Sequence, residues 1–306
     1  MGGCRRRVRR TQCRGPGAAG PEQRRGAVAL PHSPPTGLMR HLLGLLLLGL
    51  VLPALADDGA RRVVSLAPSL SEIMLELHAE DRLVGVLDGG ERPAALTALP
   101  SVGHYGQVQL ERVVALAPDL ILLWPDSVGA PMQQRLEQLG IPLLVIEPRR
   151  LDELADVFEQ IGPRVGHGAE GQALARRFRD GLAELRQRYR REPPLPVFYQ
   201  VWDHPLYTLG GRQIVSDALA LCGARNLFAD LDLPAPQVGI EAVLQRQPRV
   251  ILVSEPAQAA VWQAWPQLPA VAAGQVWAVP DRGLERPSFQ MLGATRALCE
   301  RLAQAR

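Results

Sequence analysis

Residues 107–124 have the sequence QVQLERVVALAPDLILLW, and residues 237–254, QVGIEAVLQRQPRVILVS, repeat it without a gap. Seven of the 18 positions are identical, among them Glu111 with Glu241 and Pro118 with Pro248. In each copy a short amphipathic helix precedes the proline and an apolar strand follows it. An internal repeat of this kind predicts two similar halves within one chain.

Strands and helices alternate on both sides of this repeat. The segment Arg62–Ala67 reads as a buried strand that Pro68 ends, and Ser69 with Glu72 predicts a capping box for the next helix. This alternation is typical of a parallel α/β sheet. Further strands are predicted at 83–87, 120–124, 143–146, 197–201, 250–253 and 276–279, and helices at 110–117, 132–139, 214–221 and from 290 onward.

The segment 151–194 lies between the halves. Residues 151–161 form one amphipathic stretch, a break with proline and glycine follows, and residues 169–191 continue as a long, charge-rich helix. We therefore expect an α/β protein with two Rossmann-like lobes, residues 57–150 and 195–306. A single long rigid helix joins the lobes, and the ligand cleft lies between them.

The N-terminal 56 residues differ from the rest of the chain. Arg40 precedes an almost pure Leu/Gly run that ends in small residues at Ala54 and Ala56, the pattern of a secretory signal peptide. We expect residues 39–56 to be this signal, cleaved after Ala56. Residues 1–38 are rich in Arg, Gly and Pro, and we expect a disordered extension or a stretch upstream of the true start.

Charge and cysteine content narrow the class of protein. Residues 1–56 hold nine arginines and one glutamate, so the net charge of +3 on the whole chain leaves −5 on the remainder. An acidic body argues against a nucleic-acid partner. In an exported protein, the two cysteines beyond the signal, Cys222 and Cys299, predict a structural disulfide.

Motifs for common enzyme chemistry are missing from the sequence beyond the signal. It has no phosphate-binding loop, no zinc-protease motif, no nucleophile elbow and no CxxC. Its histidines, at 78, 104, 167 and 204, lack the spacing of zinc ligands. We expect no catalytic residue, no metal site and no resident cofactor. An exported α/β enzyme and a sensor module without a solute stay open as alternatives.

Several aromatic residues fall in loops or at strand ends, where open α/β sheets bind their ligands. Their faces suit a large, flat, partly apolar ligand in a cleft between the halves. Two polar residues after the last predicted strand are candidates for hydrogen bonds to its rim. The candidate binding residues are Tyr105, Trp124, Trp202, Tyr207, Asp281 and Arg286.

A resemblance to a known family rests on residues 64–72, the block 110–121 and the long helix between the halves. Together they resemble the helical-backbone metal-receptor group of periplasmic binding proteins. Three further stretches make the chain most similar to the cobalamin-binding members of this group, which serve a vitamin-uptake ABC transporter. These stretches are residues 221–226, 234–241 and 298–299.

The resemblance implies roles for individual residues. Glu111 and Glu241 match the glutamates that dock on arginines of the membrane permease. Tyr105 and Trp124 match aromatic cleft residues, and Asp281 and Arg286 match the polar residues after the last strand. Three places depart from the family pattern: Ala235 stands where the family has a tryptophan, residues 88–92 replace a segment with a cleft tyrosine, and the loop from Asp281 to Arg286 is one residue longer.

We therefore expect a monomeric periplasmic protein that is not an enzyme. It captures cobalamin or a related corrinoid as a transported ligand and delivers it to an inner-membrane ABC importer. The alternative within the group is a ferric-siderophore or haem binder, for which Tyr105, His104 and His204 are candidate haem ligands.

Overall fold

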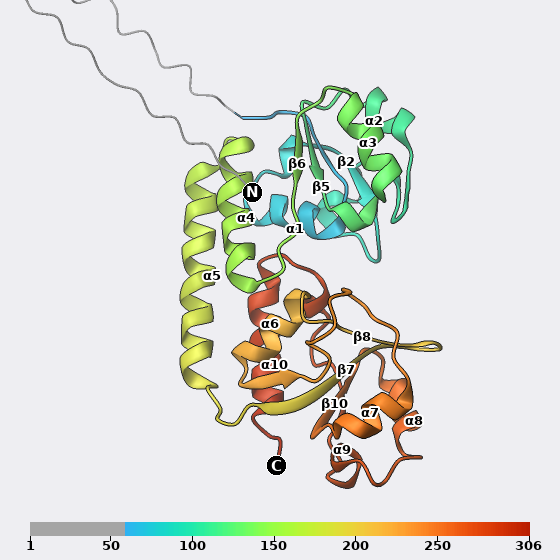
Figure 1. Ribbon diagram of the computed structural model, residues 1–306. Helices are drawn as coiled ribbons and strands as arrows, with labels where there is room; N and C mark the ends of the chain where they lie inside the picture. The colour runs from blue at the N-terminus through green and yellow to red at the C-terminus, as the bar shows by residue number, and fades with distance from the viewer. Residues whose placement is uncertain (1–58) are drawn as a thin grey trace, which may run out of the picture. The chain divides into compact units, whose positions relative to one another are not determined.

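A six-stranded sheet forms the first lobe of the computed structural model, which describes residues 59–306 (Figure 1). The strand order is β4-β3-β2-β1-β5-β6, parallel except for the antiparallel pair β3–β4. The strands are β1 Val63–Ser65, β2 Leu83–Asp88, β3 Ser101–His104, β4 Gln107–Val108, β5 Leu120–Leu123 and β6 Leu143–Val145. The helices and 3-10 turns are α1 Pro68–Glu76, η1 Glu80–Arg82, η2 Ala94–Leu96, α2 Leu110–Ala115, η3 Pro125–Ser127 and α3 Ala130–Gln138.

The second lobe has a five-stranded sheet of order β11-β10-β7-β8, with β9 also paired to β7. Only β7–β8 is antiparallel. The strands are β7 Leu195–Asp203, β8 Leu206–Thr208, β9 Ala224–Asn226, β10 Val250–Val253 and β11 Val276–Ala278. The helices and 3-10 turns are α6 Ile214–Leu221, α7 Ile240–Arg246, η4 Pro256–Gln258, α8 Ala259–Trp262, α9 Pro269–Ala272, η5 Arg282–Glu285 and α10 Gln290–Leu302.

The sequence repeat is a structural repeat. Helices α2 and α7 end in the same way, with Ala117 (φ 43°) and Gln247 (φ 49°) in the left-handed region before a proline. In each copy the residue after the proline donates its N–H to a backbone carbonyl of the neighbouring segment in the sheet. Asp119 donates to the Arg62 carbonyl, and Arg249 donates to that of Pro196. Both halves therefore attach this helix–strand unit to their sheets in one manner, as predicted.

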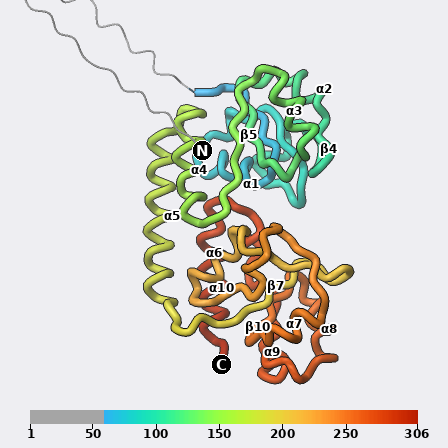
Figure 2. Tube along the Cα trace, viewed as in Figure 1, coloured from blue at the N-terminus to red at the C-terminus, as the bar shows by residue number. Residues whose placement is uncertain are grey.

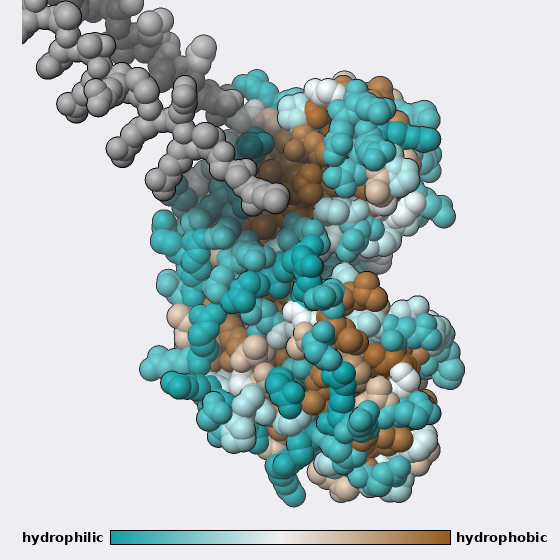
Figure 3. All heavy atoms as spheres, viewed as in Figure 1, coloured by the Kyte–Doolittle hydropathy of each residue, from teal (hydrophilic) through white to brown (hydrophobic). Residues whose placement is uncertain are grey.

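Two helices link the lobes, α4 (Leu151–Arg164) and α5 (Gly168–Arg188), and they lie side by side in Figures 1 and 2. Pro163 occupies the last turn of α4, so this helix runs further than the predicted break. The 21-residue α5 is the long linking helix, and the predicted fold class is confirmed. Hydrophilic side chains predominate over it on the face drawn in Figure 3.

Glycines let the two linking helices approach closely. A Cβ on Gly171 would lie 2.4 Å from the Phe158 carbonyl oxygen, and one on Gly162 would lie 3.1 Å from the Gly171 Cα. Beside this crossing the rings of Phe158 and Phe178 meet edge to face, with centroids 5.5 Å apart. Both belong to a buried apolar cluster that includes residues of both lobes.

The predicted capping box is wrong. Helix α1 begins at Pro68 and is preceded by Ala67, without a side-chain cap. The helix starts one residue earlier than predicted because proline is favoured at the first helical position, and Ser69 therefore lies inside the helix and not at its N-cap. Ser71 instead donates to the Ser65 hydroxyl, 2.9 Å away, and Glu72 is buried against the second lobe.

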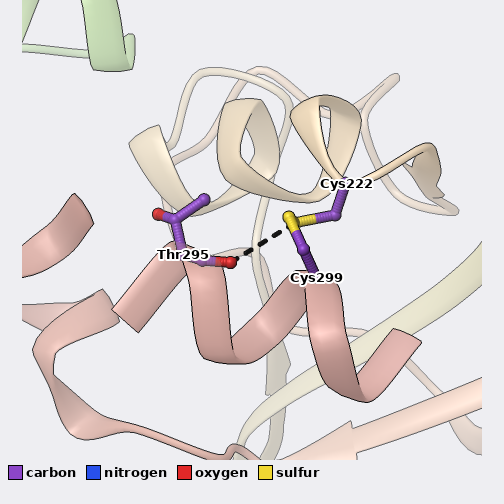
Figure 4. The surroundings of a disulfide bond; sticks show 3 residues. All are labelled: Cys222, Thr295 and Cys299. Atoms are coloured by element: carbon purple, nitrogen blue, oxygen red, sulfur yellow. Dashed lines mark hydrogen bonds between the residues drawn. A yellow bond between two sulfur atoms is a disulfide. The ribbon is translucent and has the colours of Figure 1, made fainter. Parts of the chain in front are cut away.

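The predicted disulfide is present. It joins Cys222, at the end of α6, to Cys299 in α10, with 4.7 Å between the Cα atoms (Figure 4). The carbonyl oxygen of Thr295 lies 3.6 Å from the Cys222 Sγ. The bond therefore staples two helices of the second lobe. Among the described residues, no helix is long and apolar enough to cross a membrane; the predicted signal peptide and extension lie outside them.

Candidate functional site

Two of the predicted aromatic residues lie in loops at the carboxyl edge of the first sheet. Tyr105 lies in the turn between β3 and β4, and Trp124 follows β5 directly. The Gly106 N–H donates to the Ser127 carbonyl at 2.8 Å, which ties the first turn to the second. Partial burial, and then the negative charge of Asp126, raise the pKa of Tyr105. The phenol stays neutral at physiological pH and 61% exposed, available to a ligand.

Trp124 also lines a hollow to which both lobes contribute. Its ring packs on the edge of the large apolar cluster, so only part of it faces the hollow. The wall combines apolar surface with charged groups of both signs, which suits a partly apolar ligand with polar substituents. The lining residues are Trp124, Asp126, Glu147, Pro148 and Arg149 before the linker, and Arg212, Gln213, Asp232 and Pro234 after it.

The two halves of this hollow are held together at the start of α4. The Leu151 N–H donates to Asp217 Oδ2 in α6 at 2.9 Å, and the Arg150 guanidinium lies 3.7 Å from the same carboxylate. Asp217 of the second lobe thus accepts a hydrogen bond from the backbone at the point where the chain leaves the first lobe and enters the linker. This contact joins the chain next to Arg149 to α6 just beyond Gln213, two residues that line the hollow.

The other two predicted aromatics lie on the β7–β8 hairpin. Trp202 and Tyr207 face each other across the strands, and Trp202 is 55% exposed. The Trp202 Nε1–H donates to the His204 carbonyl at 3.2 Å, within the hairpin itself. Neither residue belongs to the described lining of the hollow; the projecting hairpin (Figure 1) carries Trp202 exposed and Tyr207 half-buried.

Asp281 and Arg286 make contacts within the protein. Asp281 Oδ1 accepts from the Gly283 N–H at 2.8 Å and so caps η5, and Arg286 forms an ion pair with Glu72 of the first lobe. Arg286 also lines a second, smaller hollow together with Pro68, Asp88 and Arg92. The segment 88–92, which departs from the family pattern, therefore faces the same space as Arg286.

Asp88 is fixed within this second hollow. Hydrogen bonds from Ser101 and from Arg92 hold the pKa of its carboxyl below its usual range. Asp88 is thus a carboxylate already committed to two donors. The segment 88–92 thus carries an Asp88–Arg92 ion pair facing this hollow.

The predicted docking glutamates occupy equivalent, exposed positions. Glu111 lies in the first turn of α2 and Glu241 in the first turn of α7. Helix dipoles favour a carboxylate there, and nothing in the described contacts buries either side chain. Each lobe therefore offers one carboxylate to solvent at the corresponding point of its repeat.

Sequence reasoning missed the carboxylates that connect the lobes. Glu72 and Glu76 stand one turn apart on α1, and both accept hydrogen bonds from the segment 288–290. The signal for them is the i, i+4 spacing of two acids in an otherwise apolar helix, which puts both on one face. The capping-box interpretation obscured it, because it assigned Glu72 to the helix start. Among the described residues, no cluster of side chains has the make-up of a metal site.

Comparison with known proteins agrees with this architecture. The family model described as "Periplasmic binding protein" matches residues 63–282. Two curated relatives are named vitamin B12-binding proteins. That of Vibrio cholerae is 37% identical over 243 residues, which cover 78% of this chain and 88% of the relative. That of Vibrio parahaemolyticus is 33% identical over 249 residues, covering 80% and 90%.

Two solved structures are also similar to this chain. The periplasmic vitamin B12-binding protein BtuF of Vibrio cholerae is 36% identical with a TM-score of 0.74, over 80% of this chain and 97% of that one. The periplasmic haem-binding protein HutB of Vibrio cholerae shares the fold at 24% identity and a TM-score of 0.68, over 79% and 98% of the two chains. With two lobes, a long linking helix and this family match, the chain belongs to the periplasmic binding protein family.

Proposed function

We propose that this protein captures cobalamin or a related corrinoid in the periplasm and delivers it to an inner-membrane ABC importer. The observation that carries the proposal is the similarity to proteins named for vitamin B12 binding, over nine-tenths of their length, combined with a hollow between the lobes that contains Trp124. The family consists of binding proteins, and the proposal includes no catalysis and no cofactor apart from the transported ligand.

We assign the ligand to the carboxyl edges of the two sheets. Tyr105 and Trp124 contribute aromatic faces from the first lobe, and the exposed Trp202 with its half-buried neighbour Tyr207 contributes those of the second. Asp281 and Arg286 reach the ligand only by exchanging their present partners, Gly283 and Glu72. Ala235 stands where the family has a tryptophan, so the proposal covers cobinamide and other corrinoids as well as cobalamin.

Delivery is assigned to Glu111 and Glu241. Their exposure and their equivalence in the repeat support docking on two basic points of the permease, one for each lobe. The protein acts as a monomer in this proposal. Export by a signal at residues 39–56, with lobes at 57–150 and 195–306, completes it, and the N-terminal part lies outside the described residues.

Calorimetric titration with cyanocobalamin, haem and a ferric siderophore in parallel tests the ligand class. Tight one-to-one binding of cyanocobalamin alone is the expected result. Binding of haem or of the siderophore in its place would overturn the corrinoid assignment but leave the family. The haem-binding neighbour shares the fold alone, so it does not favour haem.

A further inference from the structure

The lobes meet at a buried polar contact between α1 and the segment that leads into α10. Figures 1 and 2 both draw this segment beside α1. We call it the inter-lobe contact and define it by the residues that make it. They are Glu72 and Glu76 of the first lobe, and Arg286, Ser288, Phe289 and Gln290 of the second.

Glu72 supplies the charged part of this contact. Its side chain is 7% exposed, pairs with Arg286 and accepts hydrogen bonds from Ser288 and the Gln290 side chain. A buried carboxylate needs such partners, because desolvation alone would oppose its charge. Each partner of Glu72 lies more than 200 residues away along the chain, on the other lobe.

Glu76 holds the backbone of the same segment. Its Oε2 accepts from the Phe289 N–H at 2.8 Å and its Oε1 from the Gln290 N–H at 3.3 Å. These amides lie at the start of α10, where helical N–H groups have no carbonyl partner within the helix. Glu76 therefore satisfies amides that would otherwise be left to water.

Phe289 anchors this segment on the linker as well. Its ring packs against Phe158 of α4 and Phe178 of α5, with centroids 6.2 and 5.8 Å away, and the Arg177 guanidinium lies 4.8 Å above it. Both lobes and both linking helices thus meet at one residue. A movement of this segment would change the relation between the lobes.

We propose that Glu76 is a positioning residue, which holds the segment 286–290 of the second lobe against the first and so sets how readily the lobes separate around the ligand. The same segment begins with Arg286, a candidate ligand residue, and continues the loop from Asp281. The effect on ligand binding rests on the proposed function, but the effect on the contact between the lobes does not.

Burial and the nearby Glu72 carboxylate give the contact a pH dependence. Desolvation, and to a smaller extent Glu72, raise the pKa of Glu76 to about 7, although the two amides act in the opposite direction. Glu72 on its own helix is the charged group that acts on it; Arg286 of the opposite segment pairs with Glu72, and Arg177 of α5 lies over the Phe289 ring. In an opened contact, Glu76 would titrate at its ordinary pKa, near 4.5.

The direction of the pH dependence follows from the two pKa values of Glu76, one in the closed contact and one in the opened contact. The closed contact binds one proton more than the opened contact between pH 4.5 and about 7, so protons favour closure. Opening becomes easier by up to about tenfold per pH unit between about pH 5 and 7, and the dependence ends above about pH 8. The contact is therefore tightest in mild acid.

Hydrogen exchange of the Phe289 and Gln290 amides in the protein without ligand tests the proposal. Rates are corrected for intrinsic exchange, so that they report opening. In the wild type, we expect opening to increase with pH up to about 7 and then to level off. Glu76→Gln keeps a neutral acceptor and should make opening independent of pH, whereas Glu76→Ala should remove protection throughout.

Glu80→Gln, an exposed glutamate just beyond α1, is the matched control and should leave the profile unchanged. A flat wild-type profile, or a Glu76→Gln profile identical to that of the wild type, would overturn the proposal. Cyanocobalamin titrations on the same variants then test the corrinoid assignment separately, because the exchange experiment contains no ligand. Failure of cyanocobalamin to bind would leave the exchange result standing.

Discussion

At the scale of the residue, Trp124 combines two properties of a ligand-binding side chain, partial burial and access to a hollow. It packs on the edge of the apolar cluster that extends over both lobes, and it lines the hollow between them. A side chain in such a place is held in one orientation by the protein and needs little ordering when a ligand arrives. That makes it the strongest candidate for an aromatic anchor.

We predict that Trp124→Ala weakens cyanocobalamin binding by ~1–3 kcal/mol, because truncating a buried aromatic contact at an interface has an effect of this size. Isothermal calorimetry measures it. Trp277→Ala is the control: this tryptophan is also half-buried but packs under Arg301, away from the hollow. Unchanged affinity in Trp124→Ala, with only lowered stability, would assign Trp124 to the core.

Glu72 gives a second prediction. Glu72→Ala leaves Arg286, Ser288 and Gln290 without their common acceptor, so we expect a loss of ~1–3 kcal/mol in the free energy of unfolding, measured with urea. Arg282→Ala breaks the exposed pair with Glu255 and should cost at most about 1 kcal/mol. Equal losses in the two variants would contradict a structural role for the buried pair.

At the scale of the element, most of the longer strands and helices could be predicted from the sequence, since apolar runs and their periodicity define them. The shortest strands could not be predicted in this way. Strands β4 and β9, with two and three residues, exist because a neighbouring strand offers them hydrogen bonds, which is a tertiary effect. The start of α1 differs from the prediction because Ser69 and Glu72 match a capping pattern, whereas the helix already begins at Pro68.

The α4–α5 packing supplies the prediction at this scale. Gly171→Ala places a methyl group against the Phe158 carbonyl, and overpacking of this kind should lower the free energy of unfolding by ~1–3 kcal/mol. Gly293→Ala in α10 meets nothing within 4 Å and should raise it by about 0.5–1 kcal/mol through helix propensity alone. Thermal unfolding of the two variants distinguishes them, and a shift of the same sign in both would refute the argument.

At the scale of the whole molecule, the candidate site could be predicted only in part. The sequence pointed to Trp124 and to a cleft between the lobes, because residues after strands gather at the carboxyl edges of sheets. It could not show that Arg286 pairs with Glu72 or that Asp281 caps η5, since these contacts depend on how loops of two lobes meet. Arg149 and Arg212, which line the hollow, carried no signal in the sequence.

Docking is the prediction for the whole molecule. Glu111→Ala combined with Glu241→Ala should leave cyanocobalamin affinity unchanged and abolish uptake in a transport assay, because both residues are exposed and belong to no described hollow. Glu137→Ala combined with Glu300→Ala removes two other exposed carboxylates and should leave uptake intact. A double docking variant that loses affinity, or that transports normally, would contradict the assignment.

The structural repeat has one further consequence for docking. A partner with two identical subunits meets nearly the same carboxylate on either lobe, so exchanging the lobes leaves the encounter almost unchanged. Two orientations related by half a turn about the axis of such a partner are equivalent for any protein that binds there, so the repeat contributes something else: one kind of basic site on the partner serves both lobes. A single substitution in that kind of site would therefore weaken both contacts at once.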